Sequence, residues 1–209
     1  MKNFQYTKND IKNLDRIYRI NLINSVTGVK PANLIGTKSK RGKENLAIFS
    51  SVIHLGSDPP HIGFMIRPQY SRITDTFKNI KETKFYTINQ ISKSLYKKAH
   101  LTSGKINESE FDKFSISKVY LNNFHAPFAK DSFIKLGMHL IELIELPNRC
   151  TLVVGEIEFI SLDENLLDNE GRIDFGTNES IGISGCDTYL SLKKIETLEY
   201  VSEKFIKNI

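Results

Sequence analysis

Residues 45–54 read Asn-Leu-Ala-Ile-Phe-Ser-Ser-Val-Ile-His, and this stretch decides the fold. Its apolar and β-branched residues are typical of a strand, which we expect to run from Asn45 to Ile53. Three polar side chains interrupt the apolar run: the amide of Asn45 at its head, and the neighbouring hydroxyls of Ser50 and Ser51. A strand that carries these groups predicts a binding surface as well as a core element.

The sequence on either side predicts two more strands. Residues 31–37 form the preceding strand, and a basic turn that contains Gly42 joins it to the central one as an antiparallel hairpin. After the central strand, Asp58-Pro59-Pro60 turns the chain, and residues 61–67 restart as a third strand that ends at Arg67. The core of the fold is therefore antiparallel.

Hydroxyls and an amide on one strand, with a guanidinium at the end of the next, suit a flat heterocycle that has a phosphate tail. A flavin fits this description. For Arg67, the alternative to a phosphate is a surface ion pair with an acid such as Asp75. Ser50 and Ser51 have their own alternative, which is to fill a corner of a barrel and bond to backbone.

The rest of the chain alternates strands with short helices. Periodicity and capping residues predict helices over 74–84, 92–101 and 107–114, strands over 85–89, 133–146 and 151–160, and a Lys- and Glu-rich helix from Leu192 onward. There is no βαβ rhythm and no glycine-rich dinucleotide motif. We therefore predict a mainly β protein with helical insertions, built on an antiparallel barrel.

Composition narrows the class of protein. The 209 residues are 40% hydrophobic and 25% charged, as expected for one globular domain. We read no signal peptide and no membrane span, and two distant cysteines argue against a disulfide framework, so we expect a cytoplasmic protein. The net charge of +5 comes from scattered lysines, which favours a solvated surface over nucleic-acid binding.

An ordered series of short motifs resembles the flavin reductase-like, FMN-binding split-barrel family. The series extends from about residue 20 to 190 and consists of Asn33-Leu34-Ile35-Gly36-Thr37, Gly42-x-x-Asn45-Leu46-Ala47-x-Phe49-Ser50-Ser51, Asp58-Pro59-Pro60, Arg67-Pro68, Asp75-Thr76-x-x-Asn79-Ile80, Ala99-His100-x-Thr102-Ser103, Gly155-Glu156 and Gly182-Ile183-Ser184-Gly185-x-Asp187-x-Tyr189. The order of the motifs is more specific than any one of them.

The resemblance implies a homodimer of six-stranded antiparallel split β-barrels of Greek-key type, with FMN near the dimer interface. Residues 1–209 would form one domain, with N- and C-terminal extensions packed on it. NADH or NADPH would reduce the flavin, and an oxygenase or another electron-acceptor protein would use it. The cofactor-binding residues carried over by position are Asn45, Leu46, Ala47, Ile48, Phe49, Ser50, Ser51, Arg67, Thr76, Asn79 and Ser103.

Other candidates stay open at this level. His100 is a candidate catalytic residue in a loop that closes over the flavin, although a lone histidine is more often a hydrogen-bonding residue. Tyr189 either packs near the ring or sits in a tight glycine turn, and the role of His54 is open. Phe124 and Phe128 form a lid or a dimer contact. The histidines have no ligand spacing, so we predict no metal site.

Three functions fit the sequence. The first is an FMN-dependent reductase that transfers hydride from NADH or NADPH to flavin. The second is an electron-transfer FMN protein without its own nicotinamide site, and a third is a cofactor-free interaction protein. An oxidase acting on a phosphorylated vitamin is a further use of the same barrel. The absence of a Ser-His-Asp motif does not exclude an enzyme, because a flavin accepts hydride itself.

Overall fold

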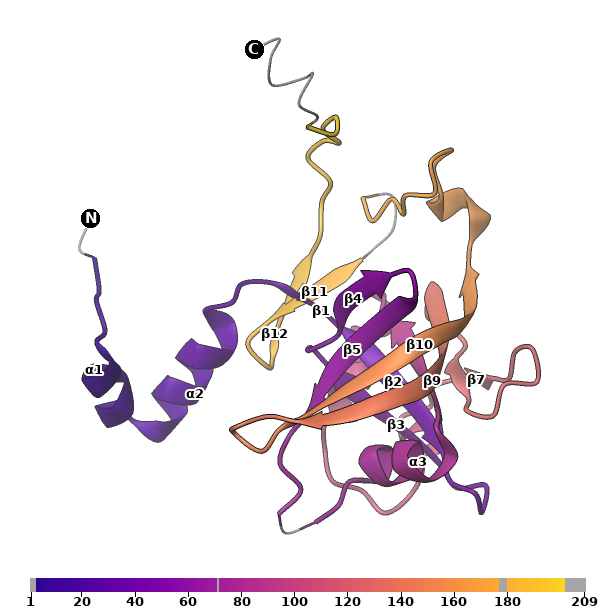
Figure 1. The fold of residues 1–209 in the computed structure, drawn as a ribbon, viewed down its shortest axis with the longest axis horizontal. Helices are drawn as coiled ribbons and strands as arrows, with labels where there is room; N and C mark the ends of the chain where they lie inside the picture. Colours follow the sequence, from indigo (N-terminus) through magenta and orange to yellow (C-terminus); the bar gives the residue numbers. More distant parts are fainter. Residues whose placement is uncertain (1–2, 71, 177–179, 202–209) are drawn as a thin grey trace.

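A seven-stranded antiparallel sheet forms the body of the protein in a computed structural model that describes residues 3–70, 72–176 and 180–201 (Figure 1). The strands lie in the order β3-β2-β6-β9-β10-β5-β4. Their bounds are β2 (Asn33–Lys38), β3 (Glu44–Phe49), β4 (Ile53–Ser57), β5 (Pro60–Ile66), β6 (Phe85–Gln90), β9 (Ile134–Glu145) and β10 (Thr151–Leu162).

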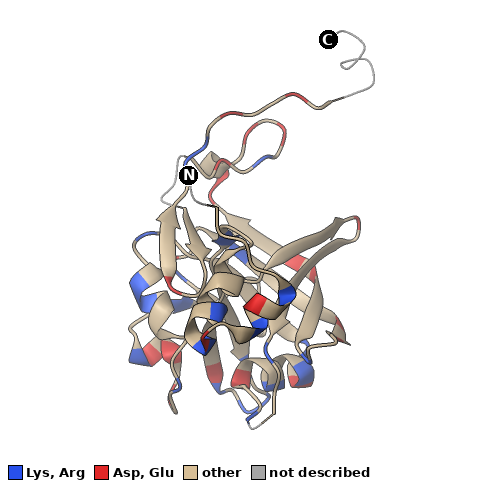
Figure 2. Ribbon diagram, turned by 90° about the vertical axis from the view of Figure 1, so that its left-hand side faces the viewer, with Lys and Arg blue, Asp and Glu red and all other residues tan. Residues whose placement is uncertain are grey.

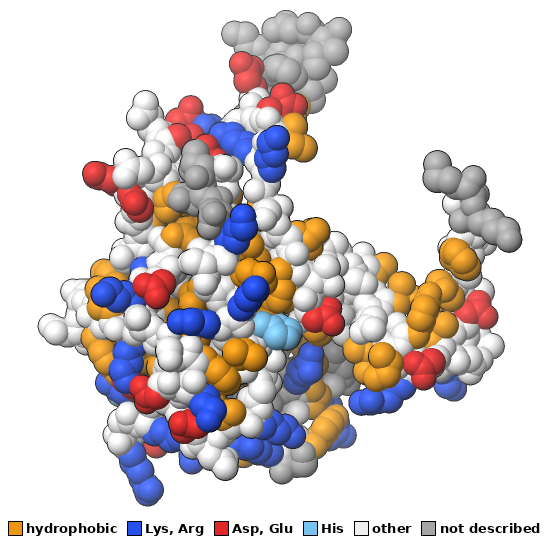
Figure 3. Space-filling view, turned by 180° about the vertical axis from the view of Figure 1, so that it is seen from behind, with side chains coloured by type: hydrophobic (Ala, Val, Ile, Leu, Met, Phe, Trp, Pro, Cys, Tyr) orange, Lys and Arg blue, Asp and Glu red, His pale blue; other side chains and the backbone are white. Residues whose placement is uncertain are grey.

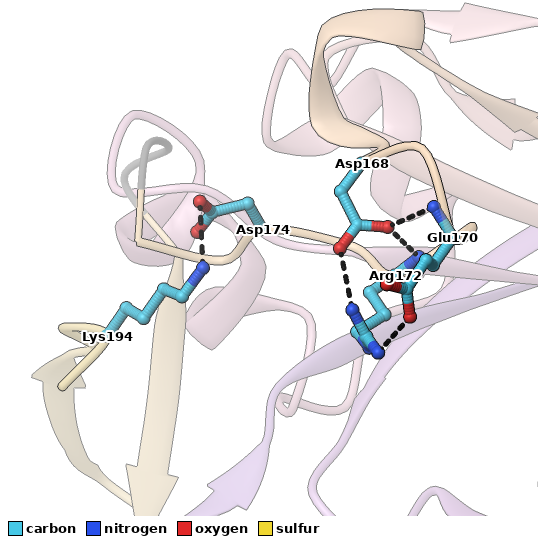
Figure 4. Close-up of polar contacts among 5 residues, drawn as sticks. All are labelled: Asp168, Glu170, Arg172, Asp174 and Lys194. Carbon is cyan, nitrogen blue, oxygen red and sulfur yellow. Dashed lines mark hydrogen bonds and ion pairs between the residues drawn. The ribbon is translucent and has the colours of Figure 1, made fainter. Parts of the chain in front are cut away.

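Two small sheets flank this body. In the first, β11 (Ile181–Ser184) lies between β1 (Lys30–Pro31) and β12 (Thr188–Ser191), so that a late hairpin joins the start of the domain. The second pairs β7 (Lys118–Val119) with β8 (Phe128–Ala129). The segment after β10 contains the 3-10 turn η1 (Glu164–Leu166), and ion pairs of Arg172 with Asp168 and Glu170 and of Lys194 with Asp174 secure it (Figure 4).

The helices are short. Their bounds are α1 (Lys8–Asn13), α2 (Arg16–Ser25), α3 (Asp75–Thr83), α4 (Tyr96–Leu101) and α5 (Glu110–Lys113). The predicted helix over 74–84 is confirmed: the Thr74 hydroxyl accepts from the N–H of Phe77, and Lys84 ends the helix in the left-handed conformation. The helices α4 and α5 are shorter than predicted, because a turn precedes Tyr96 and a bend at residues 107–108 precedes α5.

The sheet curls strongly. Its two edge strands, β3 and β4, are separated in sequence by Ser50, Ser51 and Val52 alone. Seven strands laid flat would place the edges about 29 Å apart, whereas the link from Phe49 to Ile53 reaches at most about 14 Å. The edges must therefore approach each other where β3 ends, and we call this place the seam, defined by residues 50–52.

The two faces of the curled sheet have different cores. Ile35, Phe64 and Tyr86 belong to a fully buried cluster on one face. Leu34, the neighbour of Ile35 along β2, belongs to a second cluster with residues of α4 and α5 on the opposite face. This alternation follows from the two-residue period of a strand. The cores thus fix β2 and β3 from both sides.

The observed strands correct the predicted ones in part. The mainly β prediction is confirmed, but the sheet has seven strands where six were expected, and its edges β3 and β4 are not paired with each other in the described residues. The predicted strand from Asn45 to Ile53 ends at Phe49, and the chain restarts as β4 after a bend at the seam. The bend coincides with Ser50 and Ser51, the hydroxyls that interrupt the apolar run.

The two terminal segments extend away from the sheet (Figure 1). In the N-terminal segment, neither α1 nor α2 contains a buried residue. Exposed apolar side chains such as Ile17 (56% exposed) and Ile23 gather on this segment (Figure 3). The predicted C-terminal helix is wrong for residues 192–201, which are not helical, and residues 202–209 lie outside the described part. Without an apolar surface to pack against, a short Lys- and Glu-rich segment gains little from helix formation.

Positive and negative residues are interleaved over the body, and Figure 2 shows no single basic face. In the described part of the chain, no helix is long and apolar enough to cross a membrane.

Candidate functional site

The seam joins β3 to β5 through one serine. The Ser51 hydroxyl accepts a hydrogen bond from the N–H of Met65 at 3.0 Å and lies 3.3 Å from the carbonyl oxygen of Met65. The hydroxyl therefore bonds the backbone of β5 as a neighbouring strand would. Bonding to backbone is the alternative role that the sequence left open for this serine. Ser50 has no hydrogen bond to its side chain within the described residues, so its hydroxyl is free for a ligand.

Because β3 is an edge strand, half of its backbone groups face away from β2. The N–H of Leu46 uses this outward direction to bond the Glu110 carboxylate at 2.9 Å. By the alternation of an antiparallel ladder, the N–H of Ile48 faces the same way, and no register shift interrupts the pairing of β3 with β2. The outward backbone beyond Leu46 is thus the part of this strand that suits the edge of a planar ring.

The side chains of β3 divide between the two cores. Leu46 is fully buried, Ile48 packs against the same cluster, and Phe49 packs edge-on against Phe64 with ring centroids 5.0 Å apart. Ala47 is half-buried. These side chains hold the strand in place, so a ring would meet the backbone of the strand rather than its apolar side chains.

Glu110 is a buried carboxylate that sequence reasoning missed. It is the first residue of α5, and acidic residues are common in the first turn of a helix. The sequence therefore gives no sign of its hydrogen bond to the N–H of Leu46 in β3. Desolvation raises the pKa of Glu110, and the charge of Asp75 adds to this, whereas the backbone bonds and Lys43 oppose it. Glu110 therefore links the charge state of this region to the position of β3.

Replacing Glu110 by glutamine should remove a pH-dependent loss of stability. A folded-state pKa raised above the unfolded value means that the wild type is most stable below that unfolded pKa and loses stability as pH rises through the folded pKa. Glutamine keeps an acceptor for Leu46 without a charge. The free energy of unfolding of E110Q relative to wild type, measured by urea denaturation, should rise from acid to neutral pH.

The matched control is Glu108→Gln, two residues earlier, where the carboxylate is exposed and pairs with Lys113 at 2.9 Å. This variant should show no such upward trend with pH. A flat difference between E110Q and wild type across the same range would contradict the assignment to Glu110.

Arg67 follows β5 directly and is exposed, not buried as its place in the sequence suggested. The single hydrogen bond of its guanidinium among the described residues runs from Nη2 to the Cys186 sulfur at 3.7 Å. No carboxylate of the described part lies within ion-pair distance of it. The alternative considered for Arg67, an ion pair with Asp75, is not found in the described residues, because Asp75 pairs with Lys43 at 3.0 Å. The guanidinium can therefore receive an anion.

Asn45, Thr76 and Asn79 lie elsewhere, in a buried network centred on Thr37. Asn45 donates to the hydroxyls of Thr37 and Thr76 at 3.2 and 3.0 Å, and Asn79 donates to that of Thr37 at 3.0 Å. The network joins α3 to the start of β3, whereas the seam follows the end of β3. The structure thus separates these three residues from Arg67 and Ser51, and their role as cofactor ligands stays a prediction. Asn79 is buried.

His100, near the end of α4, forms a hydrogen-bonded pair with Tyr189 of β12. Its Nδ1 lies 3.0 Å from the tyrosine hydroxyl, and the two rings meet edge to face with centroids 5.7 Å apart. Ser103 donates to the carbonyl oxygen of His100 at 2.8 Å, which closes the end of the helix. Ser103 therefore reaches the site through His100 in this structure, and its predicted contact with the cofactor stays untested.

The β11–β12 hairpin brings His100 and Arg67 to one place. Its tip contacts Arg67 through Cys186 and His100 through Tyr189. These two hairpin residues are three positions apart, so their Cα atoms lie at most about 11 Å from each other. Arg67 and His100, which are distant in sequence, therefore contact the same hairpin.

Two cavities lie away from these residues. One of about 300 Å³ is lined by Phe85, Phe124 and Phe159 together with Asn122, Asn123, His125 and Glu158. The other, of about 320 Å³, lies beside β1 and β11 and is lined by residues such as Phe133 and Phe175. Neither contains a residue of the predicted flavin site. Phe124, which lines the first cavity, packs against Phe128 in an aromatic cluster. Among the described residues, no cluster of histidine, cysteine and acidic side chains could hold a metal ion.

The family comparison covers most of the chain. Residues 29–177 match the model of the family described as "Flavin reductase like domain". A protein with a split barrel domain from Shewanella frigidimarina NCIMB 400, provisionally assigned as a flavin reductase, is 40% identical in sequence. The alignment covers 95% of this chain and 100% of that one, with a TM-score of 0.91.

Two further solved structures share the fold at lower identity. The 2-nitrobenzoate 2-nitroreductase of Pseudomonas fluorescens is 21% identical, covers 96% of this chain and 98% of its own, and has a TM-score of 0.81. Nitrilotriacetate monooxygenase component B from Bacillus cereus is 19% identical, with a TM-score of 0.83 over 95% of this chain and 100% of that one.

Proposed function

The chain belongs to the flavin reductase-like family, and from this premise we propose that it binds FMN and catalyses the reduction of flavin by NADH or NADPH. The observation that carries the proposal is the exposed guanidinium of Arg67, which has no acidic partner in the described residues and lies beside the seam. A phosphate satisfies such a group with two parallel charge-assisted bonds. FMN has the terminal phosphate that this arrangement suits.

The residues around Arg67 suit the ring and the ribityl chain of FMN. The free hydroxyl of Ser50 lies at the seam, and the outward N–H of Ile48 follows the direction of the Leu46 N–H along the edge of β3. Such backbone donors can stabilise negative charge on the pyrimidine side of a reduced flavin. When bound, the flavin supplies the hydride acceptor, so the chain needs no general base for that step.

The chain's remaining tasks are orientation and exclusion of water. Hydride transfer requires the two rings to lie at contact distance, which makes positioning the main contribution of the protein. His100 contacts the same hairpin as Arg67 and is suited to meet the nicotinamide. The apolar side chains of α2 are exposed, and no other described residue buries them, which supports a homodimer. An oxygenase or another electron-acceptor protein would consume the reduced flavin.

Adding NADH or NADPH to the FMN-loaded protein without oxygen should bleach the oxidised flavin absorbance within minutes. The measurement is a stopped-flow or diode-array titration, run in parallel with each nicotinamide and with free FMN alone. Bleaching that depends on the protein supports the reductase. A protein that binds FMN but is not bleached by either nicotinamide would be an electron-transfer flavoprotein, and a colourless protein that takes up no FMN would overturn both.

A further inference from the structure

The β11–β12 hairpin lies beyond residue 177, where the match to the family ends, yet it contacts two residues of the candidate site. It is anchored to the start of the domain, because Ile183 and Gly182 pair with Lys30 and Pro31. The hairpin is therefore a fixed element whose tip faces Arg67 and His100. Its contacts with the site therefore lie outside the residues that the family model matches.

Tyr189 is held firmly against His100. The Tyr189 ring packs on Tyr96 with centroids 5.2 Å apart, and it meets the imidazole edge to face on another side. The ring also lies against the buried cluster of β3, α4 and α5. With its ring fixed in this way, the hydroxyl stays at 3.0 Å from Nδ1 of His100.

A phenol that keeps its proton can donate to Nδ1 of the imidazole or accept a bond from Nδ1–H, and the first direction is the one that leaves Nε2 as a donor. Desolvation, with the charge of Asp187, raises the pKa of Tyr189 to about 12, so the hydroxyl keeps its proton at neutral pH. A protonated hydroxyl can donate to Nδ1, which leaves the single proton of a neutral imidazole on Nε2. In the described part of the chain, no hydrogen bond to Nε2 is found, so that nitrogen is available to a ligand.

We propose that Tyr189 is a positioning residue, whose hydroxyl holds neutral His100 as the Nε2–H tautomer and so presents one hydrogen-bond donor to the candidate site. Resting on the proposed function, the acceptor for this donor is the carboxamide oxygen of nicotinamide. A donor fixed in both tautomer and orientation loses little entropy on binding, which lowers the KM for the nicotinamide. Arg67, which contacts the same hairpin through Cys186, is left to the flavin phosphate.

Nitrogen-15 NMR of the histidine rings tests the tautomer without flavin or nicotinamide. At a pH where His100 is neutral, the wild type should show Nε2–H alone, and Tyr189→Phe should show a mixture of both tautomers. Tyr96→Phe is the matched control, because it removes a hydroxyl from the same cluster that has no hydrogen bond among the described residues. It should leave the His100 signals unchanged.

Kinetics then test the consequence for the reaction. Tyr189→Phe should raise the KM for NADH or NADPH by about 3- to 10-fold, the loss expected for one neutral hydrogen bond, with the affinity for FMN unchanged. Because phenylalanine keeps the ring, thermal unfolding should confirm an intact fold. An Nδ1–H tautomer in the wild type, or an unchanged KM in Y189F, would overturn the proposal. Absence of nicotinamide oxidation by the wild type would instead refute the proposed function, and the NMR result would still decide the tautomer.

Discussion

Replacing Arg67 by alanine is expected to weaken FMN binding by about 10- to 100-fold, because a charge-assisted bond to phosphate contributes roughly 1.5–3 kcal/mol. The guanidinium is exposed and lacks an acidic partner in the described residues, so its removal leaves no buried charge behind and should not destabilise the fold. The measurement is quenching of flavin fluorescence on titration with protein. Riboflavin, which lacks the phosphate, should bind wild type and R67A with the same affinity.

The control for net charge is Arg41→Ala. Arg41 lies in the basic turn that joins β2 to β3, at the opposite end of β3 from the seam. It should leave the affinity for FMN within about two-fold of wild type, since charges separated by more than about 10 Å are largely screened at 0.1 M salt. Equal losses in R41A and R67A would mean that general attraction of anions, rather than a phosphate site at Arg67, accounts for binding. An unchanged affinity in R67A would remove the basis of the proposed function.

Phe64→Ala should lower the free energy of unfolding by about 3–5 kcal/mol, the range for removing a fully buried aromatic ring. The Phe64 ring is 0% exposed and meets the rings of Phe49 and Tyr86 edge-on, with centroids at 5.0 and 5.5 Å. For a chain of this size such a loss lowers the thermal midpoint by about 6–20 °C. Phe49 is the last residue of β3, so the cavity would also loosen the seam.

Chemical denaturation of Phe64→Ala and of Phe4→Ala provides the comparison. Phe4 is 83% exposed, and its removal should change stability by less than about 0.5 kcal/mol. A loss of under about 1 kcal/mol for F64A would show that the neighbouring rings collapse into the space. That outcome would contradict the view that the cluster of Ile35, Phe64 and Tyr86 fixes the end of β3.

Local patterns predicted most of the secondary structure. Thr74 caps α3 as expected, and the alternation of apolar residues in 133–146 and 151–160 became the long pair β9 and β10. These features depend on neighbours within a few residues, which a sequence displays directly. The helices α1 and α2 are not predicted from the sequence, and the tail at 192–201, predicted to be helical, is not. Neither segment buries an apolar face, so its sequence has no clear periodic pattern from which to predict its structure.

The sequence by itself determined the antiparallel strands, the resemblance to the family, and the residue types that a flavin would need. Only the tertiary structure decided which of those residues meet. In the folded chain, β3 ends at the seam, and Arg67 and His100 contact one hairpin. Thr76 and Asn79 are buried with Asn45 in a separate network. Strand and helix formation depend on near neighbours, whereas these contacts join residues that only the closure of the sheet brings together.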